Sequence, residues 1–158
     1  MPLENFQARF RHHLPRSNDP ILIVLKGHLL MEELVNGLLD DLLPNAAALE
    51  RVRISLHVRL QLVRALVIPG CLDWELTAAE KLNTLRNQFA HHLEPPQIAV
   101  HVETFLRALE DPEIPASQYQ EMPAALRLKR GISLLCGALH GFSEGYAETR
   151  KIGPAIKS

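Results

Sequence analysis

One short stretch of this 158-residue chain gathers residue types that handle anions and protons. It spans residues 85–92, contains Arg86, Asn87 and His91, and is followed by a pair of prolines, Pro95-Pro96. A guanidinium binds phosphate through two N–H groups, and an imidazole takes or gives a proton near neutral pH. The same groups also suit a helix end that is held by its own side chains, so the types alone do not separate chemistry from structure.

Two chemical interpretations of this stretch are open. In the first, Arg86 binds a phosphate, Asn87 orients it and His91 moves a proton, which would cleave RNA without a metal. One imidazole per chain serves one side of the phosphate, so a symmetric dimer would bring two copies together. In the second, His91, His92 and His101 bind a metal. Adjacent histidines point about 100° apart on a helix, and no carboxylate stands at a standard ligand spacing.

A third interpretation is structural. Arg86 would act as the cation for Glu32, and His91 would cap the last carbonyl groups of its helix. Glu32 falls on the apolar side of its own predicted helix, one turn after His28, where a carboxylate is costly unless it is paired. Glu32 is therefore either a boundary residue whose carboxylate reaches water or an internal acid that pairs with a cation from another helix.

Composition limits the class of protein. Apolar residues make up 47% and charged residues 22%, as in a folded globular chain, and aromatic residues only 5%, so the core must consist mainly of aliphatic side chains. The net charge of -1 gives no global positive field, so any contact with RNA requires a local basic patch. The two cysteines, Cys71 and Cys136, are too few for a disulfide framework or a thiolate zinc site, and both are expected to be reduced core residues.

The sequence also lacks several recognisable signals. There is no Gly-rich phosphate loop, no G-x-S-x-G and no H-E-x-x-H, and we expect no cofactor and no metal. The most apolar run, residues 21–25, is far shorter than the ~20 residues of a membrane span, and the first residues do not read as a signal peptide. We therefore expect a cytoplasmic protein that does not enter a membrane.

The elements that must position residues 85–92 are helices bounded by prolines. Asp19-Pro20 is a helix start, and the apolar spacing predicts that Leu82, Leu85 and Phe89 form the core stripe of the helix that carries the motif. On that helix Asn87 and His91 lie one turn apart, whereas Arg86 projects about 140° away from His91. The expected helices cover residues 20–43, 46–67, 75–92, 96–110 and 123–149. A break before Ser55 is an alternative for the second of them.

The remaining segments complete a single domain at residues 19–150. Residues 1–18 form an N-terminal segment in which a short helix would dock Phe6 and Phe10, and residues 151–158 form a loose tail. Trp74 is expected to plug an edge of the core. Three glycines share one strip of the last helix and would let another backbone approach closely, either an internal helix or a second subunit. They are Gly137, Gly141 and Gly145.

The motif and its surroundings resemble a known superfamily. Arg86-Asn87-x-x-Ala90-His91 at a helix end resembles the R-x(4–6)-H signature of the HEPN superfamily, in which a polar residue directly after the arginine is typical. Residues 27–34, GHLLMEEL, are similar to the first long helix of such domains. Residues 55–91 are similar to the mannitol operon repressor branch. The resemblance covers roughly residues 19–94.

The resemblance implies an all-α, up-and-down bundle of about five helices, usually a homodimer in which the motifs of two chains meet. Many members are metal-independent ribonucleases that act as toxins or defence effectors. Carried over, Arg86 and His91 would be catalytic and Asn87 would assist, with Glu32 and His92 as supporting residues. An RNA substrate and an antitoxin partner would then be expected. Members like the mannitol operon repressor are instead regulators, so a non-catalytic regulatory or interaction protein is the alternative.

Overall fold

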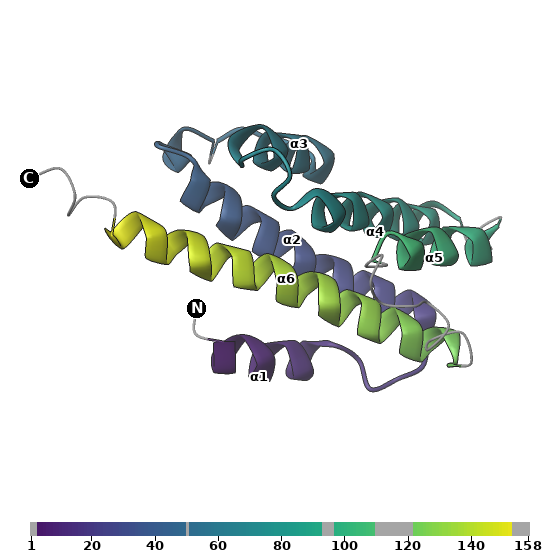
Figure 1. The fold of residues 1–158 in the computed structure, drawn as a ribbon. Helices are drawn as coiled ribbons and strands as arrows, with labels where there is room; N and C mark the ends of the chain where they lie inside the picture. Colours follow the sequence, from purple (N-terminus) through teal and green to yellow (C-terminus); the bar gives the residue numbers. More distant parts are fainter. Residues whose placement is uncertain (1–2, 50, 93–96, 110–121, 153–158) are drawn as a thin grey trace, which may run out of the picture.

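The protein is built from helices that pack side by side (Figure 1). The structure is a computed structural model, and it describes residues 3–49, 51–92, 97–109 and 122–152. Over these residues it contains no strand, which confirms the all-α class. The elements are α1 (Leu3–His13), α2 (Pro20–Leu42), the 3₁₀ turn η1 (Ala46–Leu49), α3 (Leu56–Leu66), α4 (Asp73–His91), α5 (Ile98–Arg107) and α6 (Ala124–Ile152).

The two longest helices, α2 and α6, lie side by side and run in the same direction (Figure 1). Near their starts, the Lys129 ammonium lies 3.4 Å from the side-chain oxygen of Asn18. Near their ends, the Arg150 guanidinium donates to the backbone carbonyl of Asp41 at 2.6 Å. The expected up-and-down arrangement is therefore wrong for this pair, because the chain returns through α3, α4 and α5 before α6 begins.

The close approach of α2 to α6 depends on Gly27. A Cβ atom at Gly27 would lie 2.5 Å from Cδ1 of Ile132, which is closer than two carbon atoms can pack. The strip Gly137, Gly141 and Gly145 does not have this role, since a Cβ at any of the three would meet nothing within 4 Å. The expectation that an internal helix packs on this strip is wrong.

Capping side chains set two of the helix starts. Asp19 accepts from the backbone N–H of Ile21 at 2.9 Å, and Pro20 begins α2, as predicted. Ser55 accepts from the backbone N–H of Val58 at 3.3 Å and begins α3. The continuous helix predicted over residues 46–67 is wrong, and the alternative break before Ser55 is the observed structure.

The edges of the core depart from expectation in two places. The expected docking of Phe6 and Phe10 of α1 is confirmed, since the two residues are 7% and 8% exposed. Trp74 is 38% exposed, so the expectation that it plugs an edge of the core is wrong. Cys136 is buried but Cys71 is only half-buried, so the expectation of two core cysteines is wrong for Cys71.

The expected tail begins at residue 151, but α6 extends through Ile152, and residues 153–158 lie outside the described part. None of the helices described combines the length and apolar character that crossing a membrane requires.

Candidate functional site

The last turns of α4 carry the motif, at the end of the bundle where α2 begins (Figure 1). Leu82 and Leu85 are fully buried, as predicted, and fix which face of α4 meets the core. Arg86 and Asn87 are half-buried, and His91 is exposed at the last helical residue. The packing of α4 therefore leaves the guanidinium and the imidazole within reach of solvent.

Arg86 is not the partner of Glu32. Its guanidinium donates to the side-chain oxygen of the adjacent Asn87 at 3.1 Å, and no ion pair within 4.0 Å joins it to a carboxylate in the described ranges. The structural interpretation of Arg86 as the cation for Glu32 is therefore wrong. A guanidinium has five N–H donors, so most of the hydrogen-bonding capacity of Arg86 is available to an anion.

Glu32 is a boundary residue. Its side chain is 35% exposed, and the nearest basic group is its own-helix neighbour His28, whose Nδ1 lies 3.8 Å from the carboxylate. The carboxylate thus reaches water, and the alternative that Glu32 pairs with a cation from another helix is wrong. Glu32 contributes negative charge beside the motif rather than a bond to Arg86.

His28 is the buried titratable group behind the motif, and it joins α2 to α4. Its Nε2 atom lies 3.0 Å from the side-chain oxygen of Asn83. Burial lowers the pKa of His28 below its ordinary value of 6.5, the Asn83 bond and Glu32 oppose this, and nearby Arg86 lowers it further. Burial therefore favours the neutral form of His28 at pH 7, and the hydrogen bond to Asn83 holds its Nε2 atom away from substrate.

The two histidines at the end of α4 have different surroundings. His92 reaches the last turn, since its Nδ1 lies 3.4 Å from the carbonyl oxygen of Gln88 and its backbone N–H donates to the same oxygen at 3.2 Å. The capping role predicted for His91 thus belongs to His92. The side chain of His91 makes no hydrogen bond or ion pair with any described residue. No group of three or more ligating side chains in the described ranges could hold a metal ion, including His91, His92 and His101.

A second buried histidine was not predicted from the sequence. His140 of α6 is 4% exposed, and in the part of the chain that the structure describes neither ring nitrogen has a hydrogen-bond partner. Its spacing, four residues after the buried Cys136 and eight after the buried Ile132, places it on the core stripe of α6. This spacing could have indicated the buried histidine from the sequence, because it places a polar side chain where an apolar one would be expected.

Comparison with known proteins adds no relative. No protein-family model, no curated protein and no solved structure matches this chain. The functional argument therefore rests on the site itself. Within one chain, α4 offers one half-exposed guanidinium, which has no carboxylate partner among the described residues, and one exposed imidazole, and the two side chains do not bond to each other.

Proposed function

We propose that the chain is a metal-independent ribonuclease of the HEPN type, active as a two-fold dimer. The observation that supports this most is that no carboxylate of the described residues pairs with Arg86 or His91, and both lie on the last turns of the same helix. A phosphate can therefore approach the guanidinium, and the exposed imidazole of His91, at the end of the same helix, is accessible to substrate for proton transfer.

The reaction needs no co-substrate besides the RNA. One imidazole takes the proton of a 2′-hydroxyl, and the resulting oxygen attacks the adjacent phosphorus. Arg86 stabilises the negative charge of the phosphorane through charge-assisted hydrogen bonds. The bond from phosphorus to the 5′-oxygen then breaks, and the leaving oxygen takes a proton from a second imidazole. The products are a 2′,3′-cyclic phosphate and a 5′-hydroxyl end.

The second imidazole is the reason for a dimer. His91 supplies one proton-transfer group, whereas His28 is hydrogen-bonded to Asn83 and its burial favours the neutral form. A symmetric contact at this end of the bundle would bring His91 of a second copy to the same phosphate. Exposed apolar side chains are available for such a contact on the first half of α2, namely Ile21, Leu22 and Leu29.

The experiment is cleavage of labelled RNA by the full chain in the presence of EDTA, with the ends of the products identified. His91→Ala is expected to slow cleavage by a factor on the order of 10²–10⁴, because general acid–base catalysis contributes that much. His57→Ala is the matched control, since His57 is also exposed but lies on α3. Both variants should unfold at the wild-type temperature. Absence of RNA cleavage, or equal cleavage by His91→Ala and wild type, would overturn the proposal.

A non-catalytic regulatory or interaction protein is the second candidate. The supporting observation is that Arg86 already bonds to Asn87 and lies close enough to His28 to lower its pKa, as a residue that orders the α2–α4 contact would. In that case Arg86→Ala would lower the stability of the fold, and no product would appear from any RNA.

A further inference from the structure

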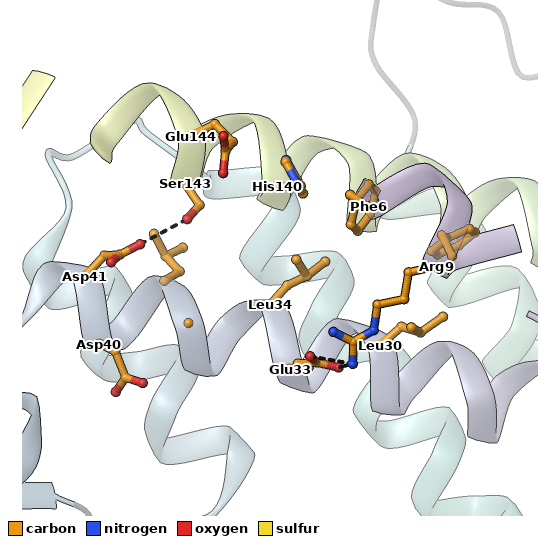
Figure 2. Close-up of a pocket in the computed structure, with 13 residues that line it drawn as sticks. Phe6, Arg9, Leu30, Glu33, Leu34, Asp40, Asp41, His140, Ser143 and Glu144 are labelled. Carbon is orange, nitrogen blue, oxygen red and sulfur yellow. Dashed lines mark hydrogen bonds and ion pairs between the residues drawn. The ribbon is translucent and has the colours of Figure 1, made fainter. Parts of the chain in front are cut away.

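The groove between α1, α2 and α6 is a second candidate binding site of this protein, and it contains no residue of the α4 motif (Figure 2). It has a volume of about 440 Å³. Pockets that hold small organic molecules typically measure about 300–1,000 Å³. Its apolar lining comes from Phe6 and Phe10 of α1 and from Leu30, Leu34 and Leu38 of α2.

His140 is the group in this groove that lacks a partner. Figure 2 shows its imidazole projecting from α6 toward α2, between Phe6 and Ser143. The ring packs against Phe6, with 4.3 Å between the centroids, and it is 4% exposed. No described residue is hydrogen-bonded to either ring nitrogen. Buried polar groups are nearly always hydrogen-bonded, so the unpaired ring indicates a ligand atom.

The charge of the groove indicates a cation. The carboxylates of Glu33, Asp40 and Asp41 line it, together with the guanidinium of Arg9. Arg9 pairs with Glu33 at 2.7 Å, and the carboxylates of Asp40 and Asp41 lie at the opposite end of the groove.

That opposite end lies around Asp41, at the end of α2. Ser143 donates to the Asp41 carboxylate at 3.2 Å, and the Arg150 guanidinium binds only the backbone carbonyl of Asp41. The carboxylate of Asp41 is therefore not paired with a cation of the described residues.

We propose that this groove binds a small primary amine with an apolar body. The ammonium group lies between Asp41 and His140 and donates one N–H to a ring nitrogen of His140. The body lies along Leu34 and Phe6 and covers apolar surface. Gly37 makes room for it, because a Cβ at that position would meet nothing within 4 Å although Gly37 lines the groove.

The test is a titration of the full isotope-labelled chain by NMR with 2-phenylethylamine, and with its neutral counterpart 2-phenylethanol. The amine is expected to bind saturably, with a dissociation constant on the order of 0.1–1 mM for a ligand of this size. The shifted signals should belong to groove residues. The alcohol should bind about tenfold more weakly, since it has no charge to interact with the carboxylates. No saturable shifts, or equal binding of the two compounds, would overturn the proposal.

Variants at Gly37 and His140 test whether the amine binds in this groove. Gly37→Leu fills the groove and should weaken amine binding by about tenfold or more. Gly141→Leu is the matched control, because Gly141 is also an exposed helical glycine with nothing within 4 Å but does not line the groove. His140→Phe keeps the ring and removes both nitrogens, so it should weaken binding and leave the fold as stable as before, or more stable. Wild-type binding by either Gly37→Leu or His140→Phe would contradict the proposed site.

Discussion

The imidazole of His28 and the side-chain amide of Asn83 form a hydrogen bond of 3.0 Å that joins α2 to α4, the helix that carries the motif. The ring is 5% exposed, so its protonation would place a charge inside the protein. Glu32 and Arg86 face it with opposite effects on its pKa, and burial decides the direction.

The first prediction follows from the lowered pKa of His28. Below its ordinary value of 6.5 the unfolded chain binds a proton that the folded chain does not, so the free energy of unfolding falls as the pH drops through 6.5 toward the folded pKa. This group contributes a slope of up to about 1.4 kcal/mol per pH unit. His28→Gln can still donate to Asn83 and should lose that slope in urea unfolding at pH 7.5, 6.5 and 5.5. The exposed control His57→Gln should keep it, and equal slopes in both variants would contradict the assignment.

The second prediction concerns Arg86 and Glu32, which are near the same imidazole but not paired with each other. In a double-mutant cycle of Arg86→Met and Glu32→Gln, we expect a coupling energy below about 0.5 kcal/mol, as for weakly interacting charges. Arg127 and Glu103 give the matched comparison, because they form an ion pair at 3.1 Å with Arg127 only 19% exposed. A coupling between Arg86 and Glu32 larger than that of the comparison pair would restore the structural interpretation of the motif.

Local signals in the sequence were sufficient for the helix that carries the motif. Asp19-Pro20 marked the start of α2, and the spacing of Leu82 and Leu85 gave the buried face of α4. These features depend on residues within a few positions of one another, which is what propensity and periodicity report. The break before Ser55 was harder to predict, because the apolar spacing continues through it while the serine cap competes for the start of α3.

Contacts between distant residues could not be read from the sequence. The bond between His28 and Asn83 joins positions 55 residues apart, and the parallel course of α2 and α6 depends on the path of the chain between them. Trp74 was expected to plug an edge of the core, yet the buried neighbour is Leu72, in a left-handed conformation with φ of 62°. Hydrophobicity alone did not decide which of the two side chains points inward.

The third prediction separates two kinds of helical glycine. Gly27→Ala places a methyl group against Ile132 and should destabilise the fold by about 1–3 kcal/mol, the usual effect of overpacking. Gly141→Ala meets nothing within 4 Å and should stabilise the fold by up to about 1 kcal/mol through helix propensity. Thermal unfolding of the two variants measures both effects. If the two substitutions had the same sign, the close approach of α2 and α6 at Gly27 would be wrong.

The fourth prediction concerns the two cysteines. Burial raises the pKa of the Cys136 thiol to about 12, so its thiolate fraction at pH 8 is on the order of 10⁻⁴. Cys71 is half-buried and reachable by a small reagent. Iodoacetamide at pH 8 should therefore modify Cys71 in the folded protein, and Cys136 only after unfolding in guanidinium, as followed by mass spectrometry. The variant Cys71→Ser contains Cys136 alone and should remain unmodified until it unfolds. Rapid modification of that variant under native conditions would mean that the face of α6 carrying Cys136 opens to solvent.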